Sequence, residues 1–230
     1  MTAHHFDFDG HHLQARASGA LFWPARRWLI VADLHLGKSE RIARRGGTLL
    51  PPYEAQATMQ RLAEEVAATD PAGIVSLGDG FDDNAAADAL PDAVLSGLHD
   101  LARGRDWLWI GGNHDPAPLS ARLPGRCLPE LADGLVLRHA AGTGPDVSGH
   151  YHPCLRLAGA RRRCFLIGTD HLILPAFGAY TGGLCATDPV LRRLVPSGLA
   201  VACGSRALPV PLPRADARAA SARPRMLRWR

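Results

Sequence analysis

Residues 28–35 read WLIVADLH, and this stretch decides the fold class. Its first part, Trp28 to Ala32, is a continuous apolar run, which is typical of a strand buried on both faces. Residues 20–33 together predict a short hairpin whose second arm is this run. The arm ends at a carboxylate, Asp33, so the sequence predicts a buried strand that delivers an acidic side chain to the edge of a sheet.

The next segments alternate between helices and strands. Helical spacing predicts helices over residues 53–68 and about 92–102. Apolar runs predict buried strands at 74–77 and 107–110. Such alternation predicts a layered α/β domain with parallel central strands, in which ligands bind at the carboxyl ends of the strands.

Beyond Leu128 the pattern changes to short strands. We expect a second, mainly antiparallel sheet that packs against the first. Its strands are predicted at 134–138, 145–148, 163–168 and 171–175, with a final hairpin around 199–210.

Composition limits the classes of protein that the chain can represent. Of its 230 residues, 47% are hydrophobic and 21% are charged, which is ordinary for a soluble globular protein. No apolar run is long enough to span a bilayer, and the first residues lack the features of a signal peptide, so we expect a cytoplasmic location without membrane contact. The five cysteines form no CxxC pair, which argues against a disulfide framework or a thiolate zinc site.

The carboxyl-terminal segment differs from the rest. Residues 214–230 hold six arginines against the single acid Asp216, which predicts a disordered basic tail after one domain over residues 1–213. Only Lys38 among the 26 basic residues is a lysine. Arginine suits bidentate phosphate contacts, but codon usage in a GC-rich genome is the favoured explanation of the bias.

Four short polar motifs follow the predicted strands in order, with one histidine before the last. Each motif alone is explained by a solvated loop, whereas the four together predict a metal-binding site. They are Asp33-Leu34-His35, Gly78-Asp79, Gly112-Asn113-His114-Asp115 and Gly149-His150-Tyr151-His152, and the single histidine is His139.

With these motifs, residues 28–153 resemble the calcineurin-like metallophosphoesterase superfamily. The resemblance implies a four-layer α-β-β-α sandwich with two mixed sheets flanked by helices. It also implies two divalent metal ions, of which Mn²⁺ is preferred here and Fe or Zn²⁺ are alternatives, because the ligands offer nitrogen and oxygen without thiolates. Such ions clamp a phosphate about 3.5–4 Å apart and generate a hydroxide that attacks phosphorus.

The resemblance assigns each ligand. One metal is expected on Asp33, His35, Asp79 and His152. The other is expected on Asn113, His139, His150 and the same Asp79, which bridges the two. His114 is not a ligand but is expected to stabilise the transition state or protonate the leaving oxygen. Asp82 is the proposed partner that orients His114, with a loop carboxylate as the alternative.

Flanking stretches resemble one subfamily, the bacterial ligase-associated DNA damage response endonucleases. These stretches are DLHLGKS at 33–39 with Arg41, Arg44 and Arg45, GALFWP at 19–24 and PAFGAYTGG at 175–183. The resemblance implies a DNA substrate, a role in DNA repair, and functional association with an ATP-dependent DNA ligase, an exonuclease and a helicase. Lys38 and Arg41 follow the first motif closely enough to contact a substrate phosphate, although a solvated face explains the arginines equally well.

Two other functions remain open at this point. A phosphodiesterase for small substrates such as cyclic nucleotides shares the whole metal site. A non-catalytic scaffold on the same fold is disfavoured because every ligand position and His114 are filled. Whether the chain forms a homodimer is also left open.

Overall fold

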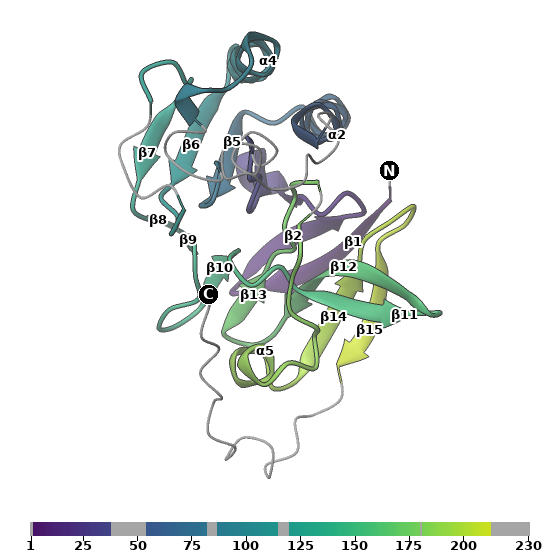
Figure 1. The fold of residues 1–230 in the computed structure, drawn as a ribbon. Coiled ribbons are helices and arrows are strands. Elements are labelled where there is room, and N and C mark those ends of the chain that lie inside the picture. The colour runs from purple at the N-terminus through teal and green to yellow at the C-terminus, as the bar shows by residue number, and fades with distance from the viewer. Residues whose placement is uncertain (1, 38–53, 82–86, 115–119, 180, 213–230) are drawn as a thin grey trace.

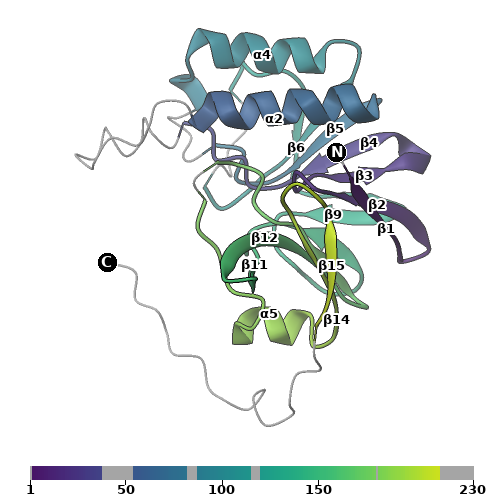
Figure 2. The ribbon, with the colours of Figure 1, turned by 90° about the vertical axis from the view of Figure 1, so that its right-hand side faces the viewer.

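The computed structural model describes residues 2–37, 54–81, 87–114, 120–179 and 181–212, which form four layers (Figures 1 and 2). Helices α2 (Glu54–Thr69) and α4 (Asp92–Ala102) lie side by side in the first layer. Two mixed sheets form the second and third layers, and the short helix α5 (Pro189–Leu194) lies on the far side. The predicted four-layer α-β-β-α architecture is confirmed, with a fourth layer that consists of this single short helix. The tail at 214–230 lies outside the described residues.

The first sheet joins an antiparallel half to a parallel half. Strands β1 to β4 pair antiparallel, and β4 to β7 pair parallel. In sheet order they are β1 (Ala3–Phe8), β2 (His11–Arg16), β3 (Leu21–Trp23), β4 (Trp28–Val31), β5 (Gly73–Leu77), β6 (Asp106–Ile110) and β7 (Arg126–Leu128). The 3-10 helix η1 (Pro24–Arg26) joins β3 to β4. The predicted hairpin and parallel strands are confirmed, whereas the β1–β2 hairpin was not predicted.

The second sheet is mainly antiparallel, as expected, although β10 pairs parallel with both β9 and β13. Its strands in order are β15 (Leu208–Leu212), β14 (Gly198–Ala202), β12 (Ala160–Ile167), β13 (His171–Ile173), β10 (Asp146–Ser148), β9 (Leu135–Arg138) and β8 (Leu131–Asp133). Strand β11 (Cys154–Leu157) pairs with β12 to form a hairpin at one end.

Alternation along the parallel strands explains their continuous apolar sequence. In β5, Ile74 faces α2 and α4, while Val75 faces the second sheet. In β6, Trp107 likewise faces the helices, while Leu108 faces the second sheet. Each strand therefore fills two cores, one under the helices and one between the sheets, and has no solvent-facing side on which polar residues could stand. Apart from the buried Ser76 in β5, the polar side chains of these strands lie at the strand ends.

Helix α2 is tied to the first sheet by a buried ion pair. The Arg16 Nε donates to Glu65 Oε2 at 2.8 Å, and the Glu65 side chain is fully buried. The apolar spacing of this helix predicted its buried face but gave no sign of a buried carboxylate on it.

Within the described ranges, no helix combines the length and the apolar character needed to cross a membrane.

Candidate metal centre

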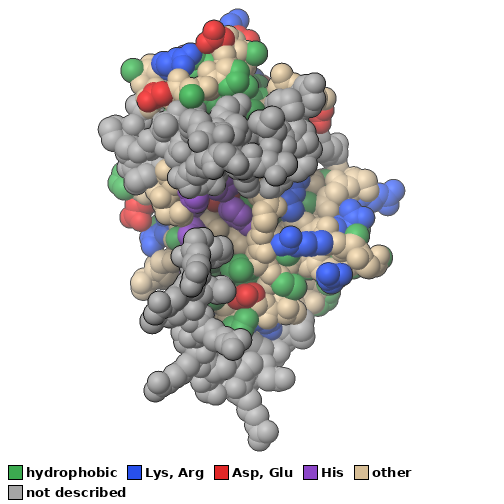
Figure 3. All heavy atoms as spheres, viewed as in Figure 1, with side chains coloured by type: hydrophobic (Ala, Val, Ile, Leu, Met, Phe, Trp, Pro, Cys, Tyr) green, Lys and Arg blue, Asp and Glu red, His purple; other side chains and the backbone are tan. Residues whose placement is uncertain are grey.

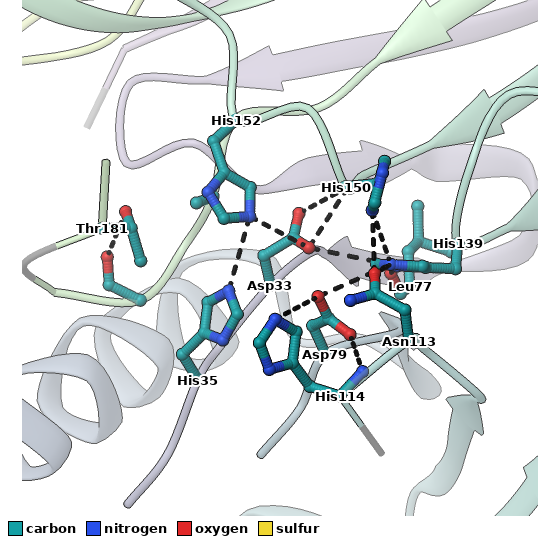
Figure 4. A network of polar contacts seen from close by, with 12 residues as sticks. Asp33, His35, Leu77, Asp79, Asn113, His114, His139, His150, His152 and Thr181 are labelled. Carbon is teal, nitrogen blue, oxygen red and sulfur yellow. Dashed lines mark hydrogen bonds and ion pairs between the residues drawn. The ribbon is translucent and has the colours of Figure 1, made fainter. Parts of the chain in front are cut away.

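The predicted motifs meet at one edge of the two sheets (Figure 4). The parallel strands β4, β5 and β6 end together there, and the loops after β9 and β10 of the second sheet approach from the opposite side. The residues brought together are Asp33, His35, Asp79, Asn113, His114, His139, His150 and His152. Because the second-sheet histidines are far from Asp33 in sequence, the site depends on the packing of the two sheets.

Strained backbone positions several of these side chains. Among the described residues, nine non-glycine residues have positive φ, and five of them are Asp33, His35, Asp79, His150 and His152. Such conformations cost about 1–3 kcal/mol each and concentrate at functional sites. Residues two apart in a strand share a face, which would explain the spacing of Asp33 and His35, but this explanation is wrong. Strand β4 ends at Val31, and both residues adopt left-handed conformations beyond it.

The first group of possible ligands is Asp33, His35 and His152, whose ligand atoms lie within 4.8 Å of one another. His152 Nε2 is 3.2 Å from Asp33 Oδ1 and 3.4 Å from His35 Nε2. The main-chain N–H of His150 donates to Asp33 Oδ2 at 2.9 Å, which fixes the orientation of the carboxylate. The Asp33 side chain is fully buried. Among the described residues no Lys or Arg lies within ion-pair distance of it.

The second group is Asp79, His139 and His150, again with ligand atoms within 4.8 Å of one another. Asn113 joins it, because its Oδ1 is 2.8 Å from His139 Nε2 and 2.9 Å from His150 Nδ1. Asp79 Oδ2 is 3.5 Å from His139 Nε2. Burial, and then the neighbouring His139, lower the pKa of His150, which favours the neutral imidazole that a metal ion requires.

The donor atoms of the second group fit a cation. His139 Nδ1 lies 3.0 Å from the carbonyl oxygen of Leu77, to which it can only donate. In the neutral ring that binds a metal, its Nε2 then presents a lone pair to the site and faces the oxygen of Asn113 at 2.8 Å. Two acceptors at this distance repel each other unless a positive charge lies between them. Both groups combine imidazole nitrogen with oxygen donors, and both could hold a divalent metal ion.

The main chain and the ring of His114 make different contacts in the site. The main-chain N–H donates to Asp79 Oδ1 at 2.9 Å, so the backbone helps to fix that carboxylate. The ring lies edge-on to His35, with 5.4 Å between ring centroids, and its Nε2 is 4.0 Å from Asp79 Oδ2. The side chain is 35% exposed.

Two glycines allow the close approaches on which the site depends. Gly78 has a φ of +73°, and a Cβ there would overlap the His139 ring. Gly183 belongs to PAFGAYTGG, and a Cβ there would overlap the carbonyl oxygen of His152. In the same segment the N–H of Gly178 donates to Asp33 O at 3.1 Å. The segment therefore packs against two of the metal-site loops, which the sequence alone did not indicate.

Not all of the predicted site residues belong to the described part of the chain. Lys38, Arg41 and Asp82 lie outside the described residues, so their roles stay predictions. The amino-terminal histidines form a separate chain of contacts on the β1–β2 hairpin, with His12 3.0 Å from Asp7 and 3.2 Å from His5. None of these three residues belongs to either group that could hold a metal.

Comparison with known proteins identifies the family. No protein-family model matches the chain, and no curated protein matches it. Among solved structures, the Pseudomonas putida nuclease MPE superimposes with a TM-score of 0.72 at 30% sequence identity, over 91% of this chain and 100% of the nuclease. The chain belongs to the metallophosphoesterases.

A second structure, the E. coli phosphoesterase YfcE, is 18% identical over 76% of this chain and 87% of its own length. Its TM-score of 0.37 is too low to bear on the assignment. The family assignment rests on the nuclease match, which covers 91% of this chain. As a metallophosphoesterase the chain is a hydrolase, which favours catalysis over the scaffold alternative.

Proposed function

We propose that this metallophosphoesterase is a metal-dependent phosphodiesterase that cleaves DNA and acts in bacterial DNA repair. One observation carries the proposal: two groups of nitrogen and oxygen donors lie side by side at the strand ends of a fold shared with a nuclease over that protein's full length. Paired sites of this kind suit in-line displacement at a phosphate, where both the attacking and the leaving oxygen carry negative charge.

In this proposal Asp33, His35 and His152 hold one ion. The other ion is held by Asp79, Asn113, His139 and His150, and Asp79 reaches both. Mn²⁺ is the proposed metal, because neutral imidazole with carboxylate and amide oxygen and no thiolate suits it. When bound, the two ions would supply Lewis-acid charge to the phosphate and a hydroxide nucleophile at neutral pH.

The protein's own residues would orient the metal-binding carboxylates and protonate the leaving oxygen. The His150 N–H holds the Asp33 carboxylate, and the His114 N–H holds that of Asp79, so both acids are fixed before substrate arrives. The His114 ring then stands beside the site as the group that donates a proton to the leaving oxygen. Asp82 as the partner of His114, and Lys38 and Arg41 as phosphate contacts, remain part of the proposal.

The test compares DNA with a small diester. Purified protein with Mn²⁺ should nick supercoiled plasmid, and a His139→Ala variant should not. Hydrolysis of a cyclic nucleotide without plasmid nicking would refute the DNA substrate and favour the small-substrate alternative. A chain that hydrolyses neither under these conditions would refute the phosphodiesterase function as a whole.

The biological setting is a separate part of the proposal. The link to an ATP-dependent ligase, an exonuclease and a helicase is tested by asking whether their genes lie beside this one, and whether deletion sensitises cells to DNA damage. A cytoplasmic location and the choice between monomer and homodimer stay predictions.

A further inference from the structure

A groove lined by arginines begins beside the candidate metal centre. A hollow of about 220 Å³ starts at His152 and includes Thr181, which lies beyond His152 in Figure 4. Arg161 and Arg163 line this hollow and also the adjoining one of about 520 Å³. The larger hollow continues to Arg61 on α2 and to Arg162. We call the two hollows together the arginine groove, and Figure 3 shows Lys and Arg side chains beside the histidines on this face.

The positive charge of the groove is not neutralised within the described residues. Glu64 is the only acid among its lining residues, against four arginines. None of the four makes an ion pair with a described residue. Burial, and then the nearby Arg163, lower the pKa of Arg61 to about 10. Cations held this close together repel one another, and an anion between them would be stabilised.

The four arginines differ in the contacts that their side chains make within the protein. Arg163 donates to the carbonyl oxygens of Ala176 and Phe177 at 2.9 and 3.1 Å, and Arg161 donates to that of Gly183 at 2.6 Å. These two therefore brace the segment that packs against the metal-site loops. Their charges still face the groove, because carbonyl groups accept hydrogen bonds without cancelling a full charge.

Arg61 and Arg162 are less constrained. The Arg61 guanidinium lies 4.9 Å from the ring centre of Phe177, and its Nε is buried with no hydrogen-bond partner among the described residues. Arg162 is exposed on β12. Both have donors available for a ligand, and guanidinium groups match the paired oxygens of a phosphate.

We propose that the arginine groove is a subsite for the phosphates that flank the scissile one in a nucleic-acid strand, with Arg61 and Arg162 as the principal contacts. The inference rests on the proposed function, since the strand must pass through the metal centre to lie in the groove. Among the described residues that line the groove there is no Phe, Tyr or Trp on which a base could stack, so we expect it to recognise the sugar–phosphate backbone. Binding there is expected to be independent of sequence and strongly dependent on salt.

The experiment measures binding rather than turnover. A fluorescein-labelled single-stranded oligonucleotide is titrated with the full chain, without added metal, over a series of salt concentrations. The variants are Arg61→Gln, Arg162→Gln and the double variant. Arg193→Gln is the matched control, because it removes the same charge from exposed α5, which contributes nothing to the groove. Thermal melting checks that each variant folds.

Each groove variant should raise Kd about tenfold at low salt. The double variant should lower the slope of log K against log salt by about 1.4, which is two phosphate contacts at roughly 0.7 each for a single strand. Arg193→Gln should change neither. If Arg61→Gln lowers the melting temperature, the test rests on Arg162→Gln alone, because the Arg162 side chain is exposed and its replacement should not affect folding.

Three results would overturn the inference: no binding by the wild type, unchanged binding in the double variant, or an equal loss in Arg193→Gln. Plasmid nicking with Mn²⁺ is scored separately. Binding that depends on the groove arginines without nicking would support the subsite and reject the proposed nuclease function. Nicking by the wild type, together with unchanged binding in the double variant, would support the proposed nuclease function and reject the subsite.

Discussion

Replacing His114 with alanine separates catalysis from metal binding. The contact that His114 makes with Asp79 Oδ1, at 2.9 Å, comes from its main-chain N–H. Alanine keeps this hydrogen bond and removes only the ring. The ring is 35% exposed, so its loss should cost little stability. The variant should therefore bind both metal ions as the wild type does.

The expected loss of turnover follows from the role of the ring. A positioned general acid contributes about 10²–10⁴ in rate. At 1.36 kcal/mol per tenfold change, this is about 2.7–5.4 kcal/mol of barrier. If the ring protonates the leaving oxygen, the loss must be larger for a basic leaving group than for p-nitrophenolate, which leaves without a proton.

The assay compares kcat for diesters of graded leaving-group basicity, with metal content measured on the same preparations. His12→Ala is a matched control, because His12 is an exposed imidazole on the β1–β2 hairpin outside both ligand groups. A His114→Ala variant with full activity would refute the assigned role. Loss of activity in parallel with loss of metal would show instead that the residue maintains the site.

Two further substitutions test the supports of the site. Glu65→Ala leaves the buried Arg16 charge without its partner and should lower the free energy of unfolding by about 3–5 kcal/mol in urea melts. Exposed Glu64→Ala should change it by less than about 0.5 kcal/mol, and equal effects would contradict the buried ion pair. Gly183→Ala places a Cβ against the His152 carbonyl and should lower metal content toward one ion per chain. Unchanged metal content and activity would show that this contact does not position His152.

The four-layer fold was predictable because its central strands are continuous apolar runs in the sequence. Strands such as β5 bury both faces, so their apolar runs are continuous and are recognised without alternation. The β1–β2 hairpin was missed because its solvent-facing side carries His5 and His12 while His4 lies on the opposite side, so the histidines obscure the alternating pattern. Helix α5 was missed because it is only six residues long.

The sequence named the residues that meet at the candidate site, but not the contacts that hold them in place. Ordered motifs named the possible ligands, yet sequence does not show that Asp33 and His35 adopt left-handed backbone or that His114 holds Asp79 through its main chain. Such details depend on how the two sheets pack. The run of three arginines at 161–163 was visible a few residues after His152, but its position in a groove beside the metal centre requires the β11–β12 hairpin.

Metal stoichiometry measured against activity is the decisive test of the two-metal centre. Metal-free protein, prepared with a chelator, is titrated with Mn²⁺ while bound metal and hydrolysis of an aryl phosphodiester are followed together. Two ions per chain are expected, with activity that appears as the second ion binds and disappears when the chelator is returned. Full hydrolysis with one ion per chain, or hydrolysis that survives the chelator, would contradict the two-metal centre.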